Sequence, residues 1–124
     1  MDTVYLIEVL GHIPNPESVL GELRRVAREN IIFTVPNCTQ QLSAGMTFTH
    51  MLDADHKNFF TFESLRALLM REFASVDVVQ VEPLDRHIAA RLLPSWGYRA
   101  WSLAHRFGWL QDRIFFRLIA NARV

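Results

Sequence analysis

Two short apolar runs, separated by one amphipathic helical pattern, decide the fold class of this 124-residue chain. Thr3–Val9 is almost continuously apolar and lies before Gly11 and Pro14, and Ile31–Val35 is a second apolar run that ends at Pro36. Such runs are typical of strands in a parallel sheet that is covered on both faces. Strand, helix and strand within about 35 residues predict a βαβ unit with a right-handed crossover.

The residues between the two runs carry the signals of a helix. Asn15 is a suitable N-cap, Pro16 fits the first helical position, and Asn30 predicts a left-handed residue that ends the helix. The apolar residues recur at helical spacing and form one stripe, which consists of Val19, Leu20, Leu23, Val26 and Ala27.

The next part of the chain predicts a loop, a helix, a strand and further helices. Residues 37–60 are irregular, and loops of this length are usually functional or disordered. Thr61 predicts the cap of a second helix, whose apolar stripe is Phe62, Leu65, Leu68, Leu69 and Phe73. Val76–Val81 predicts a third strand, and 86–110 predicts helices with a break near Pro94.

The last segment alternates strictly between two sides. Residues 113–123 place small and apolar side chains on one side and arginines among others on the other, which is the period of a strand. No helical crossover follows it, so we expect it to pair antiparallel with the third strand. The element order predicts an α/β sheet protein.

Composition excludes several classes of protein. Basic and acidic residues number 13 each, so the net charge is zero. A polyanion-coating protein needs a large positive excess, so the composition argues against a nucleic-acid partner. No apolar run approaches the roughly 18 residues of a membrane span, and the first residues lack the basic segment of a signal peptide. Cys38 is the single cysteine, which predicts a reducing, cytoplasmic location.

The zero net charge hides two oppositely charged parts. Residues 86–124 carry seven arginines and one acid, a balance of +6, whereas residues 1–85 carry six basic and 12 acidic residues, a balance of −6. All three tryptophans lie in 86–110. This basic, Trp-rich segment suits a substrate lid or a peripheral membrane contact for a lipid-like or anionic acceptor. In the alternative interpretation, its aromatic residues pack on the sheet and its arginines pair with the acidic part.

Three motifs together resemble the class I S-adenosylmethionine (SAM) dependent methyltransferases, in particular the methyltransferase type 11 and ubiquinone-pathway O-methyltransferase group. DTVYLIEVLGHIPNPESVLGELRRVA resembles the family's fourth strand and next helix, IIFTVPN its fifth strand, and DRIFFRLIANARV its seventh, antiparallel strand. The resemblance implies a Rossmann-like methyltransferase half-sheet with helices, in which family strands 4-5-7-6 lie side by side.

The family's glycine-rich SAM loop has no counterpart in this sequence, whose five glycines are scattered. We therefore interpret residues 1–124 as the C-terminal half of one SAM-methyltransferase domain, with a helical insert at 86–110 and without the N-terminal SAM-binding half. The strand at 3–9, which is central in the family, would then be an exposed edge. Such an edge predicts poor solubility or self-association through strand 3–9.

The resemblance also implies site residues. The turn after the first strand borders the methionine part of SAM in the family, so Glu8, Leu10 and His12 are predicted to contact the cofactor. His12 and His56 are the predicted catalytic residues, since an imidazole can act as general base on a hydroxyl or amine acceptor. In the alternative interpretation Glu8 and His12 only stabilise the turn. His50 is interpreted as a loop residue.

Some relatives hold a divalent metal on an E-x-x-E-H motif at the same turn, with a further histidine from the loop beyond the "PN" pair. By this resemblance Glu8, His12 and His56 form a hypothetical metal site. Gly11 replaces the second glutamate, and the loss of a carboxylate weakens Mg²⁺ binding in particular. Cys38 is interpreted as a small apolar residue.

The predicted function is SAM-dependent methyl transfer to a small-molecule acceptor by the intact protein, and a lipid-like molecule is one candidate for that acceptor. An alternative is a non-catalytic remnant or binding module that pairs through its exposed N-terminal strand. An RNA-directed enzyme is disfavoured by the missing metal carboxylate.

Overall fold

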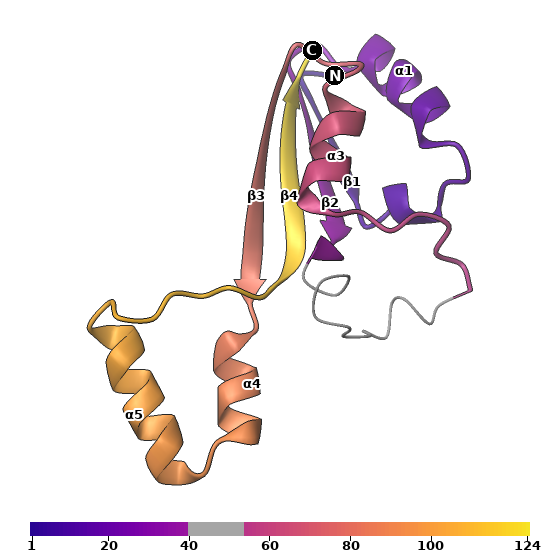
Figure 1. The fold of residues 1–124 in the computed structure, drawn as a ribbon. Coiled ribbons are helices and arrows are strands. Elements are labelled where there is room, and N and C mark those ends of the chain that lie inside the picture. The colour runs from indigo at the N-terminus through magenta and orange to yellow at the C-terminus, as the bar shows by residue number, and fades with distance from the viewer. Residues whose placement is uncertain (40–53) are drawn as a thin grey trace.

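The computed structural model describes residues 1–39 and 54–124, which form a four-stranded sheet with helices (Figure 1). The strands lie in the order β1-β2-β4-β3. Strand β1 pairs parallel with β2, and β4 pairs antiparallel with both β2 and β3. The bounds are Thr3–Ile7 for β1, Asn30–Pro36 for β2, Ser75–Pro83 for β3 and Phe115–Arg123 for β4. The α/β class, the expected strand order and the antiparallel last strand are confirmed.

The core lies between one face of the sheet and two helices, α1 (Pro16–Val26) and α3 (Phe62–Leu69). Figure 1 shows both helices on the same side of the strands. Alternate residues of β2 and β4 point into this layer, as period-two strands require. The fully buried members are Leu10, Leu20, Ile31, Phe33, Val35, Leu65, Leu69, Leu118, Ala120 and Ala122.

The end of α1 differs from the prediction. The helix ends at Val26, and Ala27 is already extended, with ψ 145°. Asn30 is the first residue of β2 and has no positive φ, so its predicted role as a left-handed stop is wrong. The amides of Arg28 and Asn30 donate to Met1 O at 2.8 Å and Asp2 O at 3.2 Å, because the chain leaves the helix directly alongside β1. Asn15 precedes Pro16 as expected, without a side-chain cap bond.

The start of α3 follows the prediction. The hydroxyl of Thr61 accepts from Ser64 N at 3.1 Å, and Ser64 Oγ accepts from Thr61 N at 2.9 Å. This reciprocal capping box satisfies two amides that the helix itself leaves without a partner. Leu65 and Leu69 then point from α3 into the core.

The opposite face of the sheet is uncovered by any helix of the described residues. Tyr5 and Ile7 of β1 are 64% and 63% exposed, and Val79 of β3 is 52% exposed. The expectation that the first strand is covered on both faces is therefore wrong for this part of the chain. Strand β1 also lies at one edge of the sheet, as the resemblance implied. We refer to this uncovered side as the open face.

The insert forms a helical hairpin of α4 (Asp85–Leu92) and α5 (Ser95–Arg106), with the predicted break at Pro94. Figure 1 shows the hairpin extending away from the sheet beyond the end of β3. Helix α5 has no buried residue, and Trp96 is 75% exposed, so the interpretation that these aromatic residues pack on the sheet is wrong. No helix among residues 1–39 and 54–124 is both long and apolar enough to cross a bilayer.

Candidate functional site

The carboxyl ends of β1, β2 and β3 and the amino end of β4 lie together where the strands terminate. This follows from the pairing, because β4 is antiparallel to both of its neighbours and β1 is parallel to β2. In this subsection and the next, the edge means this end of the sheet and not the edge strands β1 and β3. Ligands of open α/β sheets bind beyond the carboxyl ends of the strands. Glu8, Asn37, Glu82 and Arg117 all lie at this edge.

Arg117 joins Glu8, which directly follows β1, to Glu82 of β3. Its Nε lies 2.9 Å from Glu8 Oε1, and its Nη1 contacts Glu82 Oε1. About a third of the Glu8 and Arg117 side chains is exposed (33% and 32%), so the ion pair is partly desolvated. The single positive charge of Arg117 is shared by two carboxylates, so the cluster keeps a net charge of −1.

Both glutamates have backbone conformations that glutamate seldom adopts. Glu8 has φ 55° and Glu82 has φ 59°, and they are the non-glycine residues of the described chain with positive φ. Glu8 N donates to Thr34 O at 3.0 Å and lies 3.1 Å from Thr34 Oγ1, which holds the strained turn. Backbone strain of this kind costs about 1–3 kcal/mol and clusters at functional sites. Neither Glu82 nor Arg117 was singled out in the sequence, although the arginines of the last strand alternate visibly.

The turn after β1 continues into a 3₁₀ helix, η1 (Leu10–His12), which the backbone of residues 57–58 clamps. Gly11 O accepts from Lys57 N at 2.8 Å and from Asn58 N at 2.9 Å. A Cβ on Gly11 would lie 3.1 Å from Cδ2 of His56. The space that a glutamate would need at this position is therefore occupied by the His56 ring.

The clamp brings the two predicted catalytic histidines together. The ring centroids of His12 and His56 lie 4.2 Å apart, tilted by 45°. His12 Nδ1 lies 3.2 Å from the carbonyl oxygen of Asp55. Because a carbonyl only accepts, Nδ1 is the donor in this bond, so in the neutral ring the lone pair is on Nε2.

The remaining predicted site residues differ in their surroundings. Glu8 is at the edge, but its carboxylate pairs with Arg117. Leu10 is fully buried in the core and has no surface for a cofactor in this chain. Among the described residues, which include Glu8, His12 and His56, no group of three His, Cys, Asp or Glu side chains is placed to hold a metal. These residues do not fit the hypothetical metal site, and His50 lies outside the described residues.

Asn37 and Cys38 are buried where β2 ends. Asn37 Nδ2 donates to Phe115 O at 3.0 Å, and Asn37 Oδ1 accepts from Thr39 N at 3.0 Å. The asparagine of the "VPN" motif thus ties β2 to β4. Cys38 is 1% exposed, and burial raises the pKa of its thiol, although the hydrogen bond with the Phe60 backbone lowers it in part. Such a thiol is a poor nucleophile, in agreement with the predicted apolar role.

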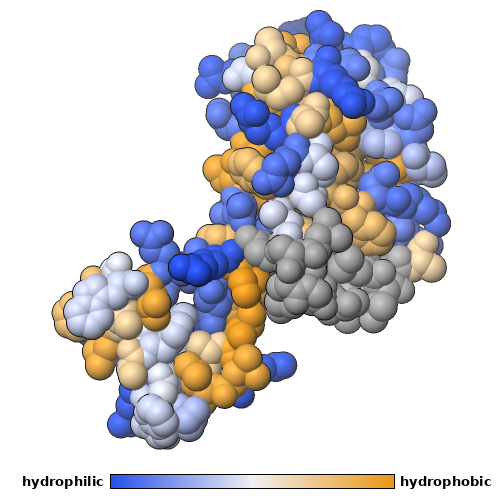
Figure 2. Space-filling view, viewed as in Figure 1, coloured by the Kyte–Doolittle hydropathy of each residue, from blue (hydrophilic) through white to orange (hydrophobic). Residues whose placement is uncertain are grey.

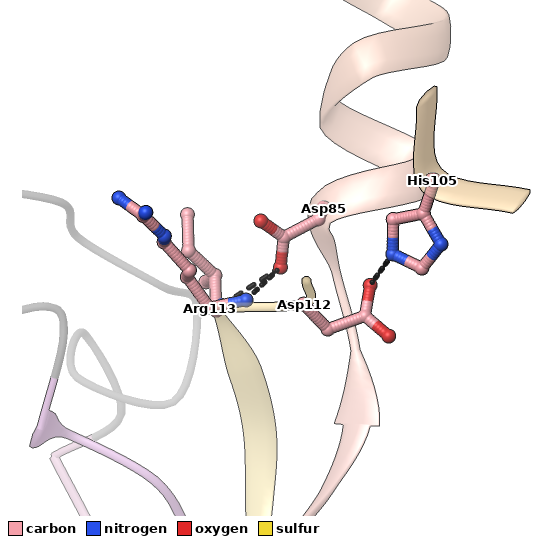
Figure 3. A network of polar contacts seen from close by, with 5 residues as sticks. Asp85, His105, Asp112 and Arg113 are labelled. Atoms are coloured by element: carbon pink, nitrogen blue, oxygen red, sulfur yellow. Dashed lines mark hydrogen bonds and ion pairs between the residues drawn. The ribbon is translucent and has the colours of Figure 1, made fainter. Parts of the chain in front are cut away.

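A cavity of about 630 Å³ lies at the base of the α4–α5 hairpin, next to the end of β3. His105 Nε2 lies 3.0 Å from Asp112 Oδ1 in its wall (Figure 3). Asp85 accepts from the amides of Arg113 and Ile114 at 2.9 and 2.7 Å, which fixes the two ends of the insert to each other. The lining residues are Pro83, Arg86, His87, Trp101, Ser102, His105, Arg106 and Asp112. The volume is in the range of small-molecule sites.

No model of a known family matches the chain, and no curated protein is matched either. Solved structures do match. A SAM-dependent methyltransferase from Archaeoglobus fulgidus superimposes with a TM-score of 0.60 at 15% identity, over 100% of this chain and 59% of that protein. Phosphoethanolamine N-methyltransferase 2 of Haemonchus contortus, in complex with SAM, gives 0.57 at 10% identity, over 99% and 33%.

Magnesium protoporphyrin IX methyltransferase from Synechocystis PCC 6803 gives a TM-score of 0.50 at 14% identity, over 98% of this chain and 44% of that protein. The chain therefore spans from a third to about three fifths of the length of these structures. At such low identity the likeness shows the fold, which is the Rossmann-like fold of methyltransferases.

Proposed function

We propose that this chain forms the acceptor-side half of a SAM-dependent methyltransferase and works together with a glycine-rich half that binds most of SAM. The observation that carries the proposal is the half-sheet β1-β2-β4-β3, which overlaps methyltransferases along its whole length. Relatives in fold have been crystallised with SAM and with S-adenosylhomocysteine, which supports SAM as the methyl donor.

The proposed reaction is a direct displacement. SAM, when bound, supplies an electrophilic methyl group. The acceptor's lone pair forms the new bond to the methyl carbon while the carbon–sulfur bond breaks, and its electron pair returns to sulfur. This step needs mainly in-line positioning of the acceptor and donor.

His12 and His56 would perform the proton transfer that a hydroxyl or amine acceptor requires. The bond from His12 Nδ1 to Asp55 O leaves Nε2 to accept that proton. Glu8 and the exposed His12 are the residues of the predicted cofactor set that reach the edge, and Leu10 supports them from the core. The proposal therefore assigns the histidine pair to the meeting point of acceptor and cofactor.

The test supplies the natural full-length protein with SAM that carries a radiolabelled methyl group and with fractions of a small-molecule cell extract. The measurement is the radiolabel transferred to molecules in those fractions. His12→Ala and His56→Ala should each lower kcat by about 10²–10⁴-fold, the usual contribution of a general base. Glu22→Gln on the exposed side of α1 is the matched control and should leave kcat unchanged. Full activity of the double variant His12→Ala/His56→Ala would disprove the assigned role, and absence of any transfer from SAM would disprove the function.

A second candidate function is a non-catalytic binding module that pairs through β1. The observation in its favour is the edge position of β1 with Tyr5 and Ile7 exposed. Equilibrium dialysis with S-adenosylhomocysteine separates the two. Binding of S-adenosylhomocysteine by the full-length protein supports the enzyme. No binding of S-adenosylhomocysteine, together with a stable complex that another protein forms through β1, supports the binding module.

A further inference from the structure

We propose that the α4–α5 hairpin docks on an anionic lipid surface through the outward face of α5. The proposal goes beyond methyl transfer, since it concerns the outward surface of the hairpin and not the histidine pair or the Arg117 cluster, and it holds whether or not SAM is bound. It starts from the exposed apolar residues of this hairpin, which are Leu92, Leu93, Trp96, Leu103, Phe107, Trp109 and Leu110. Figure 2 shows hydrophobic and near-neutral residues beside hydrophilic ones on the surface of the hairpin.

An apolar ridge runs along the outward face of α5 and includes Phe107, the residue that follows the helix. Trp96, Leu103 and Phe107 are spaced by seven and four residues, which places them on one side of a helix. Their exposed fractions are 75%, 53% and 67%. Trp109 beyond α5 is 79% exposed, and its ring centroid lies 5.8 Å from that of Phe107, so it extends the apolar surface. Leu92, the last residue of α4, is 77% exposed. An isolated apolar side chain on a surface needs no explanation, but a contiguous set does.

The inward face of α5 is already occupied. Tyr98 and Trp101 stack with ring centroids 6.1 Å apart, and Trp101 lies 5.1 Å from His105. Trp101 and His105 also line the cavity at the base of the hairpin. The helix therefore has one aromatic face turned inward and a second, separate apolar face turned outward. Packing within the hairpin accounts for the first face only.

Charge selects the partner of the outward face. Arg99 and Arg106 are seven residues apart, about two helical turns, so both lie on the same side of α5. They follow Trp96 by three and ten residues, which puts them roughly 60–80° around the helix from Trp96, beside the ridge. Residues 86–111 contain four arginines and no aspartate or glutamate. Arginines beside exposed tryptophan and leucine are typical of helices that lie in the headgroup region of a bilayer, where anionic lipids attract the cations.

A second copy of this chain could also offer negative charge, through its acidic part. Lipid is favoured because the hairpin extends away from the sheet (Figure 1) and its exposed tryptophans lie beside arginines on one short helix. Tryptophan is the residue that gains most at a membrane interface, where one part of its ring system is apolar and its N–H remains hydrated. We therefore assign the lipid surface as the occupant.

The test is flotation of the full chain with vesicles, without a methyl donor. Vesicles of phosphatidylcholine with an equal part of phosphatidylglycerol should float about tenfold more protein than vesicles of phosphatidylcholine alone, and high salt should reduce that difference. Flotation separates bound protein from any aggregate, which stays at the bottom. Trp96→Ser/Phe107→Ser should lower binding to both vesicle types, whereas Arg99→Gln/Arg106→Gln should abolish the preference for the anionic vesicles.

Tyr5→Ser/Val79→Ser is the matched control, because it removes two exposed apolar side chains from the open face of the sheet. It should float as the unmodified chain does, and circular dichroism should show that all variants keep their helix content. Equal flotation with the two vesicle types, or the same loss in the control, would overturn the proposal. So would a dimer that Trp96→Ser/Phe107→Ser dissociates in the absence of any vesicle binding, which would identify a second copy as the partner.

Discussion

At the scale of single residues, Arg117 lies between two carboxylates whose backbones are strained. Glu8 and Glu82 keep positive φ values of 55° and 59° and both pair with the same guanidinium. The ion pairs offset part of the strain, and they would leave two nearby negative charges if the arginine were removed. The backbone strain at Glu8 and Glu82 and the charges of their carboxylates therefore both depend on Arg117.

Arg117→Met should destabilise the fold by about 1–2 kcal/mol, because it leaves both carboxylates without their cation while the apolar stem still packs. Partial exposure keeps the loss below that of a fully buried pair. Urea denaturation measures it. Arg25→Met is the control, since its pair with Glu22 has side chains 70% and 69% exposed and should contribute less than about 0.5 kcal/mol. Equal losses in the two variants would show that the Arg117 cluster has no special role.

Cys38 should react slowly in the native protein. Burial raises the pKa of its thiol, so the thiolate that attacks an alkylating reagent is scarce, and the sulfur is enclosed as well. At pH 8 iodoacetamide should modify the native chain far more slowly than the chain in urea. Equal rates would contradict the buried position.

The same raised pKa gives the sign of a pH effect. The folded state holds the thiol proton more tightly than the unfolded state, so this contribution to stability is fully present below the unfolded pKa of about 8.5. It is lost as the pH rises through the folded pKa. Between pH 8 and 10 the unmodified chain should therefore lose more free energy of unfolding than Cys38→Ala does.

At the scale of elements, local signals predicted what local interactions decide. The apolar runs, Pro16 and the cap at Thr61 each act within a few residues, and β1, α1, β2 and α3 form where they indicate. The prediction that Asn30 ends α1 in a left-handed conformation is wrong because backbone hydrogen bonds to Met1 and Asp2, almost thirty positions away, direct the chain into β2. The sheet order came from the family resemblance, since a period of two does not specify a neighbour.

The candidate site was predictable only in part for the same reason. His12 and His56 were both singled out, and the backbone clamp on Gly11 brings their rings together. The contact of Arg117 with Glu8 and Glu82 depends on the register of three strands, which the sequence does not display. The burial of Leu10 likewise follows from packing that a motif comparison does not include.

The capping box of α3 offers a test at this scale. Thr61→Ala removes the hydroxyl that accepts from Ser64 N and should lower the free energy of unfolding by about 1 kcal/mol. Thr61→Ser keeps the oxygen and should cost only a few tenths of that. Thermal or urea unfolding of the two variants measures the difference, and an equal loss in both would assign the effect to the methyl group instead of the cap.

At the scale of the whole molecule, the two edges of the sheet differ in how they are protected. The edge strand β3 carries Asp77 and Glu82 and ends at Pro83, and charges and proline are the usual means of keeping an edge from pairing. The other edge strand, β1, reads TVYLI and carries none of these. Its outer backbone groups therefore present a template that another strand can extend, whether that strand belongs to a glycine-rich half or to a second copy.

We expect the chain alone to self-associate through β1 in a concentration-dependent manner. Ile7→Lys places a charge on this strand at a side chain that is 63% exposed, so it should reduce the association without disturbing the core. Val79→Lys puts the same charge on the same open face but on the protected strand β3, where it should have little effect on pairing. Sedimentation velocity over a range of concentrations distinguishes the two. If Val79→Lys dissociates the assembly as well as Ile7→Lys does, the chains associate through the open face and not through the edge strand β1. The complementary half of a methyltransferase would then have to displace this face-to-face contact before it could pair with β1.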